Sequence, residues 1–225
     1  MAQRKTREAP EVVKERVELA AIELFAARGA DGVSVGQIAA AVGMSSQAVL
    51  YHYGSKAALH NAVTERILTV TTGWLAQFAT PDDLTVSVDG LTDVLLGFVR
   101  DNPWVPTAIL RELLREPDAS QARFQDATIG WRNTIAEAMR AGQEGGVIRP
   151  DLDARSWFDR VALMVLGSLS FPHRKHPLPP GSPESVALRA ELRETVRIAL
   201  TSAFVDPGPW LEGRGFEALG DLAPA

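Results

Sequence analysis

Residues 33–59 constrain the fold of this chain most, because they carry two helix starts and one helix stop in close succession. Ser34 and Gln37 form the S-x-x-Q pattern of a capping box, so we expect a helix to begin at Ser34. Gly43 supplies a residue that tolerates positive φ at the end of a helix, and Ser45 is a second N-cap. Two short helices joined by a tight turn form a helix-turn-helix, whose second helix typically lies in a DNA major groove.

Further helices are predicted on both sides of this motif. Apolar residues recur at helical spacing over residues 13–25, and Gly29 ends that helix. An apolar stripe from Leu59 to Phe78 predicts a long connecting helix that begins at Ser55 and ends before residues 80–83.

The remaining sequence is a series of helical patterns separated by Pro, Gly and Asp. The expected helices cover residues 88–101, 104–116, 119–143, 157–169 and 188–200. The predicted fold is therefore all-α, with about nine helices. We assign an N-terminal arm and helix-turn-helix domain to residues 1–54, a connecting helix to 55–79, a C-terminal domain to 80–205 and an irregular tail to 206–225.

Composition limits the possible functions. An apolar content of 46% in 225 residues suits one or two domains with a sizeable core. The chain has no Cys, no H-E-x-x-H or G-x-S-x-G pattern and no Gly-rich phosphate loop, so an enzyme is not expected. It has no run of about 18 apolar residues and no apolar leader, which predicts a cytoplasmic protein without a membrane partner.

The net charge of −5 is unevenly distributed. Residues 1–66 carry eight Lys or Arg against seven Asp or Glu, whereas residues 67–225 carry 15 against 21. The helix-turn-helix thus avoids most of the acidic charge, which would oppose binding to phosphate. Arg4, Lys5 and Arg7 form either a frayed tail or a basic arm that reaches DNA.

The sequence from Glu18 to Leu59 resembles the N-terminal domain of TetR-type transcriptional regulators, and the similarity extends over about residues 12–65. The residues that carry it keep the spacing of the family pattern: Phe25, Gly29, Ser34, Ile38, Ala39, Gly43, Met44, Ser45, Tyr51, His52, Tyr53, Ser55 and Lys56. The resemblance implies a homodimer whose helical C-terminal domain senses a small ligand and so controls DNA binding.

Several side chains of the motif are expected to contact double-stranded DNA. Ser46 and Gln47 lie in the first turn of the second helix, and Gln47 can make a bidentate contact to adenine unless it is only a solvated helix residue. Ser34 and Ser45 either donate to phosphate or serve only as caps. Tyr51, His52 and Lys56 complete the set as phosphate contacts, with a core or capping role as the alternative for His52.

Two positions depart from the family pattern. Many members have an aromatic residue where this chain has Leu50, so the phosphate contact is assigned to Tyr51, and Leu50 either touches a thymine methyl or packs inward. Some members have a base-directed polar residue where this chain has Gly36, so base recognition is expected to depend on the second helix of the motif.

A ligand site is predicted in the C-terminal domain. The candidate residues are Phe98, Trp104, Arg111, Trp131 and Met164. Plain core packing is the alternative for the apolar members, and pairing with a carboxylate or exposure to water is the alternative for Arg111. We expect no metal and no cofactor, since His173 and His176 lie in a Pro-rich loop without a nearby carboxylate or Cys.

The sequence therefore predicts a homodimeric repressor that leaves a palindromic operator when a small apolar ligand binds. Dimerisation is assigned to the last two helices, because residues 157–169 are apolar on most sides and the family resemblance implies a four-helix bundle there. The alternative is a DNA-binding dimer without a ligand, whose C-terminal domain serves only dimerisation or a protein partner.

Overall fold

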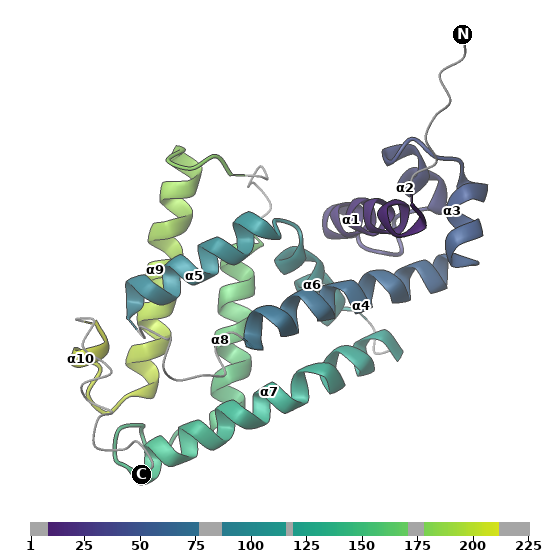
Figure 1. The fold of residues 1–225 in the computed structure, drawn as a ribbon. Helices are drawn as coiled ribbons and strands as arrows, with labels where there is room; N and C mark the ends of the chain where they lie inside the picture. The colour runs from purple at the N-terminus through teal and green to yellow at the C-terminus, as the bar shows by residue number, and fades with distance from the viewer. Residues whose placement is uncertain (1–8, 77–86, 116–118, 171–177, 212–225) are drawn as a thin grey trace. The chain divides into compact units, whose positions relative to one another are not determined.

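The computed structural model describes residues 9–76, 87–115, 119–170 and 178–211. Within these ranges the chain forms nine helices of seven or more residues and one short C-terminal helix, with an isolated bridge between Ile148 and Phe204 in place of any strand (Figure 1). The helices are α1 (Pro10–Arg28), α2 (Val35–Ala41), α3 (Ser46–Tyr53), α4 (Lys56–Leu75), α5 (Val88–Asp101), α6 (Val105–Leu113), α7 (Ala119–Glu144), α8 (Ala154–Leu169), α9 (Pro183–Ala203) and α10 (Gly208–Leu211). The all-α prediction is confirmed.

The predicted helix signals of the motif are all present. The Gln37 amide donates to Ser34 Oγ at 3.2 Å, and the Ser34 amide donates to Gln37 Oε1 at 2.8 Å, which is a complete capping box. Gly43 follows α2 with a φ of 69°, a value that favours glycine. Ser45 Oγ accepts from the Ala48 amide at 3.1 Å and starts α3.

The chain divides into two compact units, residues 1–70 and 71–225, so the division lies inside α4. Three side chains explain why the first part of α4 belongs to the N-terminal unit. Leu59, Val63 and Ile67 recur every four residues on α4, and each is at most 7% exposed. These apolar side chains are buried within the first unit, as are Val17 of α1 and Val49 of α3.

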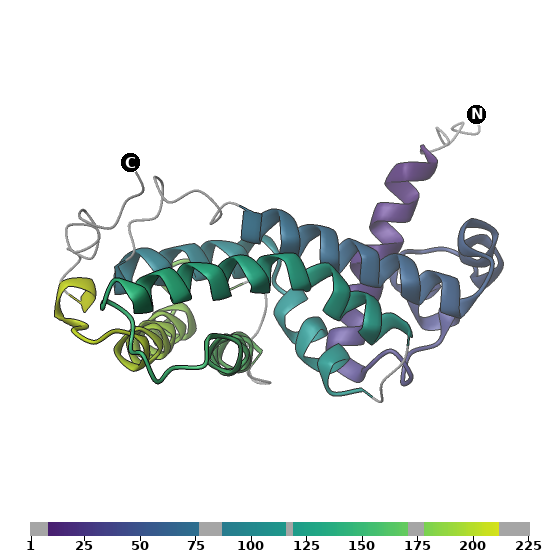
Figure 2. The same ribbon diagram turned by 90° about the horizontal axis from the view of Figure 1, so that it is seen from below.

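In the second unit α8 packs against α6, α7 and α9, and α5 packs against α9. Helices α8 and α9 run antiparallel, and both are seen nearly end-on in Figure 2. Two hydrogen bonds join them, from Trp157 Nε1 to Ser202 Oγ at 2.8 Å and between the hydroxyls of Ser168 and Thr195 at 3.1 Å. One buried hydrophobic cluster of this unit consists of Val99 of α5, Leu169 of α8, and Leu188 and Leu192 of α9.

The structure differs from the sequence-based expectation at the C-terminus. Gly208–Leu211 is a single helical turn within the segment expected to be irregular. Asp206 Oδ1 accepts from the Gly208 amide at 2.9 Å, and Pro207 O accepts from the Leu211 amide at 3.0 Å. One side-chain acceptor is enough to start this turn, but so short a turn has no apolar periodicity to reveal it.

Some expectations lie outside the described residues. These include the basic residues of the N-terminal arm, Phe78, the breaks at residues 80–83 and at Pro117, and the pair His173 and His176. No helix among the described residues is long and apolar enough to span a membrane.

Candidate nucleic-acid interface

Helix α3 has one buried face and one open face. Val49 is fully buried, whereas Ser46, Gln47, Leu50 and Tyr51 are exposed. Tyr51 is 83% exposed, a large value for an aromatic side chain in an ordered helix. An aromatic and an amide side chain thus lie on the face of α3 that the protein core leaves uncovered.

The two capping serines stand at the N-termini of α2 and α3. Both Ser34 and Ser45 are exposed, and each hydroxyl oxygen accepts an amide hydrogen bond. Their capping role is confirmed. Since a hydroxyl that accepts still has its own hydrogen to donate, a phosphate contact is compatible with the cap and stays a prediction.

The other predicted phosphate contacts lie at the end of α3 and the start of α4. The rings of Tyr51 and His52 meet edge to face at 5.6 Å between centroids, and His52 is partly buried. Lys56 Nζ donates to Asp31 O across 3.5 Å, while Ser55 Oγ accepts from the Ala58 amide at 3.1 Å. Lys56 therefore lies beside a capped helix N-terminus, where the helix dipole favours an anion.

The structure bears on both departures from the family pattern. Leu50 is 37% exposed, so it is not packed inward and remains available to a thymine methyl. A Cβ on Gly36 would lie 3.4 Å from Ser46 Oγ, because α2 and α3 approach closely there. A side chain at position 36 would thus stand directly beside Ser46.

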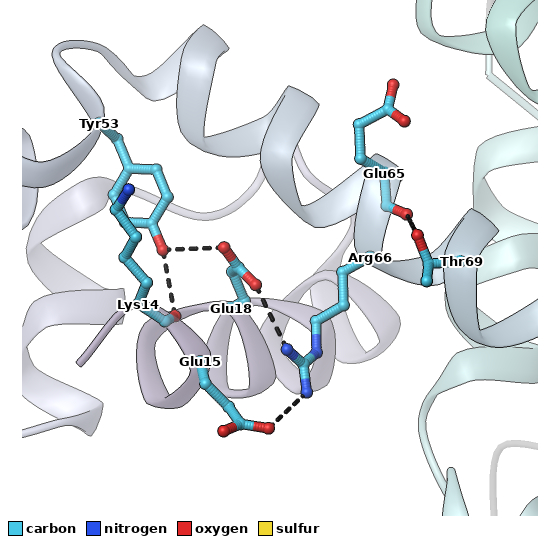
Figure 3. A network of polar contacts seen from close by, with 7 residues as sticks. All are labelled: Lys14, Glu15, Glu18, Tyr53, Glu65, Arg66 and Thr69. Atoms are coloured by element: carbon cyan, nitrogen blue, oxygen red, sulfur yellow. Dashed lines mark hydrogen bonds and ion pairs between the residues drawn. The ribbon is translucent and has the colours of Figure 1, made fainter. Parts of the chain in front are cut away.

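A polar network that the sequence does not predict lies behind α3. The Tyr53 hydroxyl lies 3.1 Å from both Lys14 O and Glu18 Oε1, and Glu18 also pairs with Arg66 at 3.5 Å. Glu15 pairs with the same guanidinium at 2.8 Å (Figure 3). Partners separated by 35 and 48 residues leave no local pattern in the sequence, and Tyr53 itself was noted only as part of the aromatic cluster.

Burial is the main cause of the raised pKa of Tyr53. The nearby negative charge of Glu18, and its hydrogen bond to the phenol, raise the pKa further, whereas Arg66 lowers it. The hydroxyl therefore stays protonated at neutral pH and acts as the donor in this network.

The predicted ligand residues have different environments. Phe98 is 6% exposed and packs against Trp74 with 4.7 Å between ring centroids. Trp104 is partly buried at the start of α6, whereas Arg111 is exposed on α6 and Met164 is 38% exposed on α8. Trp131 lies in α7, but its side chain is outside the described part of the structure.

The helix-turn-helix region matches the model of a known family. The model for bacterial regulatory proteins of the tetR family matches residues 19–63, which contain α2, α3 and the first part of α4. These residues are therefore similar to the DNA-binding segment of tetR-family regulatory proteins. The proteins that this chain resembles are transcriptional regulators, which agrees with the function expected from the sequence.

Similarity to individual proteins extends beyond the helix-turn-helix. The HTH-type transcriptional repressor SCO4008 of Streptomyces coelicolor is 25% identical over 189 residues, which are 84% of this chain and 95% of that protein. A TetR family transcriptional regulator from Chloroflexus aurantiacus has a TM-score of 0.64 at 18% identity, with 88% of this chain and 96% of the other covered. The ketosteroid transcriptional regulator KstR2 of Mycobacterium tuberculosis has a TM-score of 0.63 at 17% identity, with 91% and 98% covered. The TetR-family fold thus includes the C-terminal unit.

Proposed function

We propose that this protein is a homodimeric repressor of the TetR family, which binds a palindromic operator through α3 and acts in the bacterial cytoplasm. The observation that carries the proposal is the open face of α3, where Gln47 and Tyr51 are exposed while Val49 fixes the opposite face in the core. A helix held in this way presents side chains to a major groove without rearrangement of the domain.

The roles of the individual side chains follow from their chemistry. Gln47 reads a base, since its amide both donates and accepts in the pattern that adenine offers, and Ser46 lies beside it. Tyr51, His52 and Lys56 contact phosphates and fix the register of α3 on the duplex. Ser34 and Ser45 donate to phosphate from the two helix N-termini while they remain caps.

Exposed apolar side chains on α8 and α9 support the homodimer. Leu163 of α8 is 49% exposed, and Ile198 of α9 is 42% exposed. A second copy of the chain that packs on these helices would cover apolar surface and form a four-helix contact. Two copies of α3 would then reach successive major grooves, roughly 34 to 36 Å apart, which requires a palindromic site.

Release by a small apolar ligand is the second part of the proposal. The Trp74 and Phe98 rings give the C-terminal unit an aromatic cluster of the kind that lines apolar ligand sites, and Trp104, Arg111, Trp131 and Met164 are the other candidates. The close packing of Phe98 on Trp74 also favours the alternative, in which this unit is a plain dimerisation or docking body. Compounds that lower operator affinity would support the ligand, whereas insensitivity to every compound and to substitution of Phe98 or Trp104 would support the alternative.

Selection from a library of random duplexes tests the proposed DNA reading. The purified protein is mixed with the library at moderate salt, and the retained duplexes are sequenced. We expect enrichment of one palindrome with half-sites about one helical turn apart. Retention that is independent of sequence and lost with added salt would contradict the roles given to Gln47 and to the dimer.

A further inference from the structure

The polar network behind α3 joins three helices of the N-terminal unit. Tyr53 is the last residue of α3, Glu15 and Glu18 belong to α1, and Arg66 belongs to α4. Figure 3 shows the Tyr53 hydroxyl directed at Glu18, and the Arg66 guanidinium placed between Glu18 and Glu15. We call these four residues the Tyr53 network. None of them lies on the exposed part of α3.

Tyr53 adds a directional contact to a helix otherwise held by apolar packing. Val49 and Tyr53 are four residues apart and share one side of α3, whereas Gln47 and Tyr51 are more exposed. Contact with Val49 limits the distance of α3 from the core but permits small rotations, because apolar packing has no preferred direction. The single hydrogen of the phenol is shared between Lys14 O and Glu18 Oε1, and this contact depends on distance and angle, so it sets the rotation and tilt of α3.

Glu18 is itself held in place by charge. Its side chain is 16% exposed and Arg66 is 26% exposed, so their contact is shielded from water more than an ordinary surface pair. Glu15, at 56% exposed, binds the other side of the same guanidinium. Without Arg66, two carboxylates one helical turn apart on α1 would repel each other, and Glu18 would lose the charge that orients it towards Tyr53.

We propose that Tyr53, Glu18 and Arg66 are positioning residues for base recognition, which act from the side of α3 opposite the DNA. Arg66 orients Glu18, Glu18 and the Lys14 carbonyl hold the Tyr53 hydroxyl, and Tyr53 sets the angle at which α3 presents Gln47. Contacts to phosphate tolerate a change in that angle better than bidentate contacts to a base edge. Loss of the network should therefore lower discrimination between sequences more than it lowers general DNA affinity. This inference rests on the proposed function of α3.

The test measures two dissociation constants for each variant, one for the selected operator and one for a scrambled duplex of equal length. Tyr53→Phe removes a single oxygen atom and keeps the ring. We expect the ratio of the two constants to fall about three- to tenfold, the effect of one lost hydrogen bond on the contact that it positions. Affinity for the scrambled duplex should stay within about twofold, because phosphate contacts supply that binding.

Two controls separate positioning from stability. Ile22→Val shortens a side chain of α1 that is 3% exposed and destabilises the fold by about as much as one lost hydrogen bond. Glu23→Gln removes an exposed carboxylate of α1 outside the network. In both variants, the ratio of the dissociation constants for scrambled duplex and operator should equal that of the unaltered protein. All proteins are compared well below their unfolding temperatures, with helix content checked by circular dichroism.

A double-mutant cycle tests the order of contacts. Arg66→Met should reduce the ratio as Tyr53→Phe does, and the double variant should lose little more than the larger single loss, since both changes act through Glu18. Glu18→Gln keeps an oxygen acceptor for Tyr53 but removes the ion pair with Arg66. The ratio of the two dissociation constants should therefore fall less in Glu18→Gln than in Glu18→Ala.

The outcomes are distinct. An unchanged ratio in Tyr53→Phe, or an equal fall in Ile22→Val, would overturn the positioning role while the proposed function stood. Strictly additive losses in the cycle would overturn the chain of contacts from Arg66 to Tyr53. If the unaltered protein failed to prefer any duplex, the proposed function itself would fail, and this inference with it.

Discussion

Tyr53 is the residue whose ionisation the structure perturbs most clearly. Its pKa in the folded protein is raised above the ordinary value of about 10, chiefly by burial and then by Glu18. The stability that this group contributes is therefore fully present below about pH 10, and is lost as the pH rises through the folded-state pKa, because only the unfolded chain readily releases the proton.

We predict that the unaltered protein loses stability more steeply than Tyr53→Phe between about pH 9 and pH 11. Urea unfolding followed by circular dichroism at several pH values measures this difference. Every other titratable group is present in both proteins, so its contribution cancels in the comparison. Parallel stability profiles would show that Tyr53 has the same pKa in the folded and unfolded states.

At the scale of single residues, the sequence predicts exposed side chains better than it predicts contacts between residues that are distant in sequence. Ser34, Ser45 and Gln47 were identified from short spacings, and the structure confirms the two caps through contacts three residues apart. Tyr53 and Arg66 meet Glu18 across 35 and 48 residues, and that proximity exists only after α1, α3 and α4 have packed.

At the scale of single helices, the start of α3 depends on one side chain, that of Ser45. Ser45→Ala removes the acceptor for the Ala48 amide and should cost about 1 kcal/mol of unfolding free energy. Ser46→Ala is the matched control, because Ser46 is the next residue, is also exposed and does not cap α3. Urea unfolding of both variants checks the prediction, and an equal loss of stability in Ser46→Ala would contradict it.

Helix ends were predictable where a local chemical signal marks them. The capping box of Ser34 and the positive φ of Gly43 delimit α2 as expected. Helix α9, in contrast, begins at Pro183 after the Ser182 cap, five residues before Leu188, where its apolar pattern starts. The residues between Pro183 and Leu188 are mostly exposed, including Val186 at 59%, so no buried apolar face marks them in the hydrophobic periodicity.

At the scale of the whole molecule, the boundary between the two compact units depends on which side chains are buried more than on where helices begin and end. The sequence places a boundary before the connecting helix, whereas the two compact units meet within α4, after Val70. Leu59 and Val63 are each 1% exposed, and both belong to the first unit. A stripe of apolar residues predicts that a helix will be buried, but it cannot specify which unit buries each turn.

The proposed dimer requires a symmetric DNA site, which a single subunit would not. A symmetric dimer presents Gln47 twice, so any base that it reads must occur once in each half-site. The phosphate contacts assigned to Tyr51, His52 and Lys56 are repeated in the same way, but they carry no base preference. Symmetry in the recognition pattern therefore reports on the dimer and on α3 together.

The most direct test of base reading by α3 is a comparison of the unaltered protein with Gln47→Ala on the selected operator and all of its single-base variants. We predict that the unaltered protein shows a symmetric pattern of preference. Gln47→Ala should lose about 1 to 3 kcal/mol of discrimination at one position in each half-site and keep it elsewhere. A uniform loss of affinity across all duplexes would contradict the account, because it would make Gln47 a general DNA contact and not a reader of sequence.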